Sequence, residues 1–194
     1  MSVPAAPTVR RVVVVHGYDA APDSHWFPWL RESLEADGVR TELAELPEPS
    51  FPEAGAWLEA VGEAVGTPDE HTHLVAHSLG CVTVLRHLAR LPQPWTLGGI
   101  VLVAGFTGPL ESTPLLDGFL AEDVDLSAVR ANARRRLVLR SDDDPTVPAA
   151  ATEELAARLG AELRVVPGAG HFTGSDGVSR LPAVLGALTP RDGG

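Results

Sequence analysis

Four consecutive valines at residues 12–15 constrain the fold more than any other stretch of this sequence. A strand with one face in water alternates apolar and polar residues, and this run does not alternate. A β-branched strand that is apolar on both sides is typical of a parallel sheet covered by helices on both faces. The run therefore predicts a buried strand inside an α/β protein.

Strand-like and helix-like segments alternate along the rest of the chain, which is typical of βαβ units. The predicted strands are residues 12–15, 39–43, 72–76, 100–104, 137–140 and 162–166, and the predicted helices are 28–38, 54–65, 79–91, 148–159 and 178–188. We expect segment 105–126 to be irregular, with a short helix, and to form a small cap. The pattern predicts an α/β fold of about six mostly parallel strands with helices on both faces. We expect one domain over residues 1–194, with loosely ordered tails at 1–9 and 189–194.

Composition excludes several classes of function. The formal net charge of −11 disfavours binding to nucleic acid or to an anionic membrane surface. The chain has no lysine, which excludes Schiff-base chemistry, and its one cysteine excludes an intramolecular disulfide or a cysteine-rich zinc site. No secretory signal and no run of 18 apolar residues is present, so we expect a cytoplasmic protein without a membrane span, metal or cofactor.

The stretch LVAHSLGC, residues 74–81, places Ser78 between a predicted strand and a predicted helix. Serine is a favoured N-cap, so the position alone does not imply chemistry. A nucleophilic serine on a sharp strand-to-helix turn needs small residues two positions before and after it. Ala76 and Gly80 occupy these positions, and Ala76 departs mildly from the usual glycine. We predict Ser78 as the nucleophile.

A serine nucleophile needs a histidine base, which a carboxylate orients. Asp144 follows the fifth predicted strand in a D-x-x-V-P arrangement, and His171 follows the sixth in the glycine-rich stretch PGAGHF. The chain order serine, acid, histidine is the one that α/β-hydrolases use. We predict Asp144 as the acid and His171 as the base, with Asp142 and Asp143 as turn formers or solvated residues.

Acyl transfer also needs hydrogen-bond donors for the developing oxyanion. The backbone N–H of Leu79 lies at the start of a helix, and that of Tyr18 follows the first strand in the sequence HGYD. We predict these two amides as the oxyanion hole. Trp26, Phe106 and Phe172 are candidate substrate-binding residues, although Trp26 could equally pack the first helix on the sheet.

Four motifs together resemble a known family. HGYDAAPDSHWFPWL, VAHSLGC, SDDDPTVP and GAGHF are similar to the small serine hydrolases related to retinoblastoma-binding protein 9 and the bacterial YdeN proteins. The resemblance covers nearly the whole chain. It implies a compact α/β-hydrolase fold with the strand order 2-1-3-4-5-6 and no large lid. It also implies a triad of Ser78, Asp144 and His171, and it supplies no substrate.

The sequence predicts a serine hydrolase that cleaves a small ester, thioester or amide through an acyl-enzyme. The alternative is a catalytically weak hydrolase-fold protein that acts mainly as a binding module for a protein partner. A nucleotide-binding flavodoxin-like domain is disfavoured because the first strand is followed by HGYDA and not by a glycine-rich phosphate loop.

Overall fold

The computed structural model describes residues 8–189 and contains a six-stranded parallel sheet in the order β2-β1-β3-β4-β5-β6. The strands are β1 (Arg11–Val15), β2 (Arg40–Ala44), β3 (Thr72–His77), β4 (Leu97–Val103), β5 (Ala133–Ser141) and β6 (Glu162–Val166). The predicted fold and strand order are therefore confirmed. The predicted loose tails fall mainly on residues 1–7 and 190–194, which lie outside the described residues.

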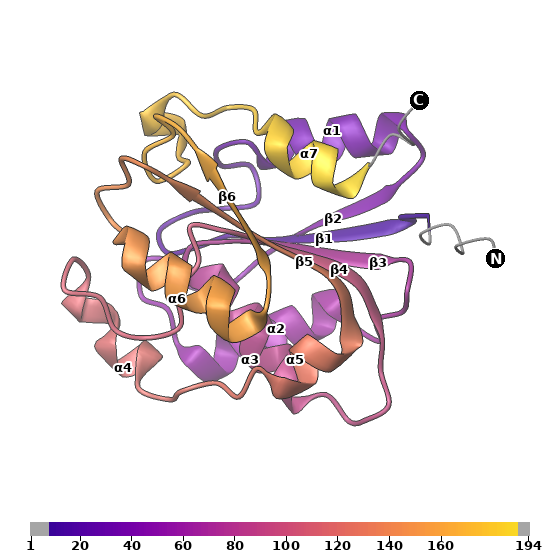
Figure 1. Cartoon of the computed structure of the whole chain (residues 1–194), viewed down its shortest axis with the longest axis horizontal. Coiled ribbons are helices and arrows are strands. Elements are labelled where there is room, and N and C mark those ends of the chain that lie inside the picture. Colours follow the sequence, from indigo (N-terminus) through magenta and orange to yellow (C-terminus); the bar gives the residue numbers. More distant parts are fainter. Residues whose placement is uncertain (1–7, 190–194) are drawn as a thin grey trace.

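Helices cover both faces of the sheet (Figure 1). One face carries α1 (Phe27–Ala36) and α7 (Pro182–Leu188). The other carries α2 (Ala54–Val65), α3 (Leu79–Arg90), α5 (Ser127–Asn132) and α6 (Ala149–Leu159). Three short elements complete the chain: η1 (Pro114–Leu116), α4 (Asp117–Leu120) and η2 (Gly174–Asp176). Among residues 8–189, every helix is too short or too polar to cross a lipid bilayer.

A hydrophobic core lies on each face of the sheet, and the valine run of β1 contributes to both. The reason is that successive side chains of a strand point to opposite faces. Val12 and Val14 pack with α1 and α7, whereas Val13 and Val15 pack with α2 and α3. All four are at most 2% exposed. Burying each valine is worth about 1.5–3 kcal/mol, which holds β1 firmly in the middle of the fold.

Strand β5 and helix α7 each begin four residues from the predicted start, the largest boundary differences. Strand β5 begins at Ala133, four residues earlier than expected, and its exposed Arg134 and Arg135 hide the start from a hydrophobicity pattern. The last helix begins only at Pro182, because the chain first forms η2 and turns at Gly177, whose φ is 81°. A left-handed φ of this kind ends helical structure and favours glycine.

Residues 105–126, between β4 and α5, form the expected small cap. Seven of its apolar side chains are buried in the same core as α2 and α3: Phe106, Leu110, Leu116, Phe119, Leu120, Val124 and Leu126. The cap therefore packs as part of the fold on the side of the sheet that carries α3.

Candidate active site

Ser78 occupies a strained turn between β3 and α3. Its φ and ψ are 53° and −124°, a region that residues with a Cβ rarely adopt. Its N–H donates to the carbonyl of Val103 at 2.9 Å, which ties the turn to the end of β4. The Oγ atom of Ser78 faces Nε2 of His171, and the residue is 7% exposed. Strain of this kind costs about 1–3 kcal/mol and is typical of functional positions.

The two small residues that flank Ser78 are not equivalent. A Cβ at Gly80 would lie 2.3 Å from the carbonyl oxygen of His16, so no larger residue fits without a backbone shift. A Cβ at Gly17 would lie 2.9 Å from the Cβ of Ser78. By contrast, Ala76 is fully buried within β3 and the core accommodates its methyl group. The departure from glycine at residue 76 is therefore compatible with the turn.

The three residues predicted as a triad lie in a continuous hydrogen-bonded row. The Nε2 atom of His171 is 2.9 Å from Oγ of Ser78, and Nδ1 is 2.9 Å from Oδ2 of Asp144. With Nδ1 protonated, His171 donates to Asp144 and accepts from Ser78. This is the arrangement in which histidine can remove the serine proton while the carboxylate keeps the ring oriented.

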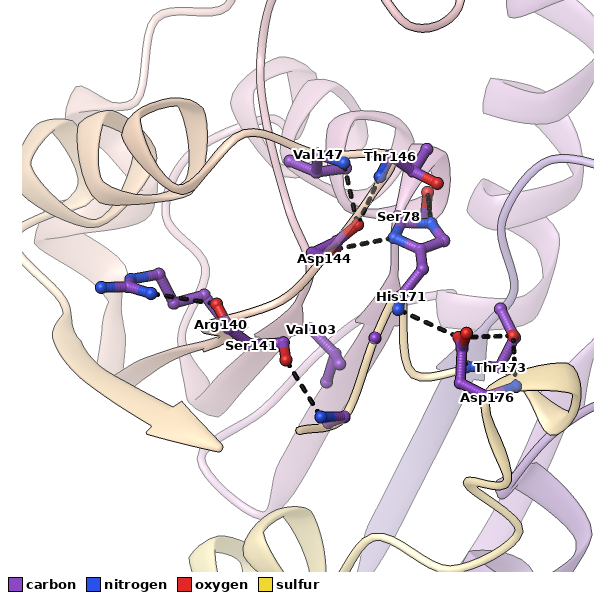
Figure 2. A network of polar contacts seen from close by, with 12 residues as sticks. Ser78, Val103, Arg140, Ser141, Asp144, Thr146, Val147, His171, Thr173 and Asp176 are labelled. Atoms are coloured by element: carbon purple, nitrogen blue, oxygen red, sulfur yellow. Dashed lines mark hydrogen bonds and ion pairs between the residues drawn. The ribbon is translucent and has the colours of Figure 1, made fainter. Parts of the chain in front are cut away.

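Asp144 is held on both of its oxygens. Figure 2 shows Oδ2 facing His171 while Oδ1 accepts the backbone N–H groups of Thr146 at 2.8 Å and Val147 at 2.9 Å. The Asp144 side chain is only 6% exposed. Aspartate commonly accepts amides two and three residues ahead of it in turns, and here that local bond fixes the carboxylate toward the histidine.

Residues 141–143 bind the loop that carries His171, residues 167–171, which we call the histidine loop. Each of the three accepts one backbone N–H from residues 168–170. Ser141 Oγ accepts the N–H of Ala169 at 3.0 Å, Asp142 Oδ1 that of Gly168 at 2.8 Å, and Asp143 Oδ1 that of Gly170 at 2.8 Å. Asp142 and Asp143 are exposed, as predicted for solvated residues. Their contacts to the loop were not predicted, because a sequence does not show which backbone amides will face a carboxylate across the sheet edge.

The other side of the histidine loop is held by Asp176 and His77. The N–H of His171 donates to Oδ2 of Asp176 at 3.0 Å (Figure 2), and Nε2 of His77 donates to the carbonyl of His171 at 2.8 Å. His77 is the residue just before Ser78, so the two sides of the site are bridged directly.

Burial keeps the supporting histidines uncharged. It places the pKa of His77 well below the ordinary 6.5, and the neighbouring imidazole of His171 lowers it further. His25 stacks edge-on against His77, with ring centroids 5.5 Å apart, and its pKa is also lowered by burial. A neutral His77 presents one N–H, which the carbonyl of His171 uses.

The two predicted oxyanion amides, those of Tyr18 and Leu79, belong to segments that meet at Ser78. Gly17 packs against Ser78 so closely that a Cβ there would be 3.4 Å from the backbone nitrogen of Leu79. Tyr18 directly follows Gly17 in the chain. Neither the Tyr18 nor the Leu79 amide has a hydrogen-bond partner among residues 8–189. Both N–H groups are thus free to receive an anionic oxygen near Ser78.

A cavity of about 180 Å³ opens at Ser78 and His171. Its other walls come from Tyr18, Phe106 and residues of the cap and the Asp144 turn: Leu110, Thr113, Leu116 and Thr146. Phe106 therefore lies where a substrate-binding residue was expected.

Trp26 and Phe172 do not line this cavity. Both are 0% exposed and pack in the core between the sheet and helices α1 and α7. The expectation that they contact substrate is corrected here: their large apolar rings stabilise the opposite face of the sheet, and Trp26 packs the first helix as the alternative predicted.

Two other kinds of reactive site, a metal-binding cluster and a reactive thiol, can be checked among residues 8–189. No group of three or more histidine, cysteine, aspartate or glutamate side chains in that range is arranged to hold a metal ion. Cys81 is fully buried one turn into α3, and desolvation strongly raises the pKa of its thiol. A thiol that stays protonated is a poor nucleophile, so Cys81 behaves as a small core residue.

Known proteins resemble this chain over nearly its full length. It is 39% identical to the YdeN protein of Bacillus subtilis (strain 168) over 180 residues, which are 93% of this chain and 95% of YdeN. The crystal structure of the ydeN gene product superposes with a TM-score of 0.90, covering 94% of this chain and 98% of that one. Rat (Rattus norvegicus) serine hydrolase RBBP9 is 27% identical over 188 residues, 96% of this chain and 98% of RBBP9.

A more distant structure shares the fold. Est1E from Butyrivibrio proteoclasticus superposes with a TM-score of 0.67 at 17% identity, covering 93% of this chain and 86% of Est1E. The profile of the serine hydrolase family matches residues 12–190. Together with the strained Ser78 turn, these likenesses lead to one conclusion: the chain belongs to the serine hydrolase family.

Proposed function

We propose that this protein hydrolyses a small ester, thioester or amide through an acyl-enzyme formed on Ser78. The observation that carries the proposal is the row Asp144–His171–Ser78, in which both hydrogen bonds measure 2.9 Å. A serine hydroxyl is a weak nucleophile, and a base at this distance is what activates it.

In the first half-reaction, Ser78 Oγ attacks the substrate carbonyl carbon and its proton moves to Nε2 of His171. The negative charge on the carbonyl oxygen is received by the amides of Tyr18 and Leu79. Removing one such donor from a serine hydrolase typically costs about 3–4 kcal/mol of transition-state stabilisation. His171 then protonates the leaving alcohol, thiol or amine, the carbonyl–leaving-group bond breaks, and the acyl group stays on Ser78.

In the second half-reaction, water takes the place of the leaving group. His171 removes a proton from the water, hydroxide adds to the acyl carbon, and the same two amides receive the oxyanion. Collapse of this intermediate returns the proton to Ser78 and releases the carboxylic acid. Asp144 holds the imidazole in place and stabilises the imidazolium that forms in each half.

Labelling and turnover test the proposal together. A fluorophosphonate probe at neutral pH should label the wild type and fail to label Ser78→Ala, and p-nitrophenyl acetate hydrolysis should fall by several orders of magnitude in Ser78→Ala and His171→Ala. Ser33→Ala, which removes a hydroxyl bonded to the Trp29 carbonyl in α1, is the matched control and should behave as wild type.

If the protein is instead a binding module, the wild type should show neither labelling nor turnover. Folded wild-type protein that neither reacts with the probe nor turns over a broad panel of esters, thioesters and amides would contradict the proposal. Binding to a protein partner that persists in Ser78→Ala would then favour the interaction role.

A further inference from the structure

A second, larger hollow adjoins the catalytic cavity. It is a groove of about 680 Å³ between segment 50–54, which leads into α2, and residues 115–119 of the cap. Tyr18 and Leu116 line both the groove and the cavity at Ser78. The two spaces therefore border each other at Tyr18 and Leu116, and a substrate chain from Ser78 would pass these two residues to reach the groove.

The groove carries the most exposed large apolar side chains of residues 8–189. Phe51 is 83% exposed and Leu115 is 64% exposed, one in each of the two bordering segments. Isolated exposed apolar residues are common on protein surfaces. Two of them bordering one groove beside a nucleophile are typical of an apolar binding surface.

The two polar side chains that segment 50–54 contributes to the groove are already engaged. The Glu53 carboxylate accepts the N–H groups of Gly55 at 3.1 Å and Ala56 at 2.7 Å as the N-cap of α2. The Ser50 hydroxyl donates to the carboxylate of Asp19. Among residues 8–189, no arginine lines the groove, and the one carboxylate that does would repel an anion. The chemistry of the groove thus suits an uncharged apolar chain.

The reaction geometry decides which part of the substrate this is. The leaving group must lie beside Nε2 of His171, which protonates it. His171 lines the smaller cavity but not the groove, whereas Tyr18, whose amide receives the oxyanion, lines both. Resting on the proposed function, we infer that the groove binds the apolar acyl chain of a medium-chain ester, thioester or amide, and that the smaller cavity receives the leaving group.

Esters with one leaving group and two acyl lengths test this inference. The ratio of kcat/KM for p-nitrophenyl octanoate to that for p-nitrophenyl acetate should fall about tenfold or more in Phe51→Ser/Leu115→Ser, because apolar contacts to the long chain are lost. The control is Leu163→Ser/Val165→Ser, which removes two partly exposed apolar residues from β6, outside the groove, and should leave the ratio unchanged.

A binding measurement separates the groove from the chemistry. Octanamide should bind the Ser78→Ala protein in a calorimetric titration, and adding Phe51→Ser/Leu115→Ser should weaken that binding about tenfold. Suppose that octanamide binding depends on Phe51 and Leu115 but the wild-type protein hydrolyses none of the p-nitrophenyl esters. This result would support the groove and contradict the proposed function.

Two outcomes overturn the inference while leaving the proposed function intact. One is Ser78-dependent hydrolysis with an octanoate-to-acetate ratio that Phe51→Ser/Leu115→Ser does not change. The other is a fall in kcat/KM of Phe51→Ser/Leu115→Ser that is seen only with acetate esters of bulky alcohols. That result would assign the groove to the leaving group.

Discussion

The backbone N–H of Gly170 donates to Oδ1 of Asp143 at 2.8 Å, one residue before His171. The same carboxylate accepts the Ser141 hydroxyl at 2.5 Å. The Ser141 hydroxyl, and to a smaller extent the Gly170 amide, hold the pKa of Asp143 below its usual range. An exposed aspartate outside the triad thereby fixes the backbone that carries the candidate base.

Removing this contact should impair turnover more than binding. We expect Asp143→Ala to lower kcat about tenfold with little change in KM, because a small displacement of a catalytic group is costly. Asp143→Asn should retain most of the activity, since its amide oxygen can still accept from Gly170. Steady-state kinetics with p-nitrophenyl acetate measure both.

Asp125→Ala is the control for Asp143→Ala. Asp125 is also exposed and accepts the N–H and hydroxyl of Ser127, but it lies before α5 and outside the catalytic cavity. The kcat of Asp125→Ala should equal that of the wild type. Equal kinetics for Asp143→Ala and Asp125→Ala would show that the Gly170 contact does not position His171.

The strained backbone of Ser78 predicts an inverted order of stability. Glycine in place of alanine usually destabilises a helix or strand by about 0.5–1 kcal/mol. At residue 78, with φ at 53°, Ser78→Gly should be about 1 kcal/mol more stable than Ser78→Ala, because glycine adopts this conformation without strain. Urea unfolding measures the difference.

The ordinary order should hold at the exposed Ala157 of α6, where Ala157→Gly should lose about 0.5–1 kcal/mol. If Ser78→Gly proves less stable than Ser78→Ala by the same amount, residue 78 stores no strain in the folded protein.

Gly80 and Gly186 should respond oppositely to the same added methyl group. Gly80→Ala puts a Cβ 2.3 Å from the His16 carbonyl, so we expect a loss of at least about 2 kcal/mol or failure to fold. Gly186 lies in α7, where an added Cβ would meet no atom within 4 Å, and Gly186→Ala should gain about 0.5–1 kcal/mol. Thermal and urea unfolding of both variants give the comparison, and a Gly80→Ala protein as stable as wild type would contradict the close packing of β1 against the Ser78 turn.

His73 should make the protein less stable in mild acid. Burial lowers its pKa from 6.5 to about 4, so between these values the unfolded chain binds a proton that the folded protein does not. The contribution of His73 to the free energy of unfolding is therefore full above pH 6.5 and falls as the pH drops toward 4, by about 3 kcal/mol in all.

Urea unfolding of wild type and His73→Asn at pH 7 and pH 4.5 measures this contribution. Burial also lowers the pKa values of four other histidines, His16, His25, His77 and His87, and both proteins contain them. The change in unfolding free energy between the two pH values therefore differs between the proteins only by the contribution of His73. Identical slopes would mean that His73 does not stay neutral in the folded state.

The sequence by itself determined the architecture, because the signals for it are local. The unbroken valines of β1 could be stable only when buried on both faces, and the strand–helix alternation then required a parallel sheet. The order of Ser78, Asp144 and His171, each just past a strand, identified the three candidate catalytic residues. Carboxyl ends of parallel strands meet at one edge, so residues distant in the chain were expected to converge there.

Tertiary structure decided what depends on contacts between distant segments. The aspartates before Asp144 gained their role only when the end of β5 met the amides of residues 168–170, and those partners carry no side-chain signal. Trp26 and Phe106 are both aromatic and both follow strand ends, yet one is buried under α1 and the other borders Ser78. Which face of the sheet an aromatic ring covers is set by how the loop returns across it, and local sequence does not encode that path.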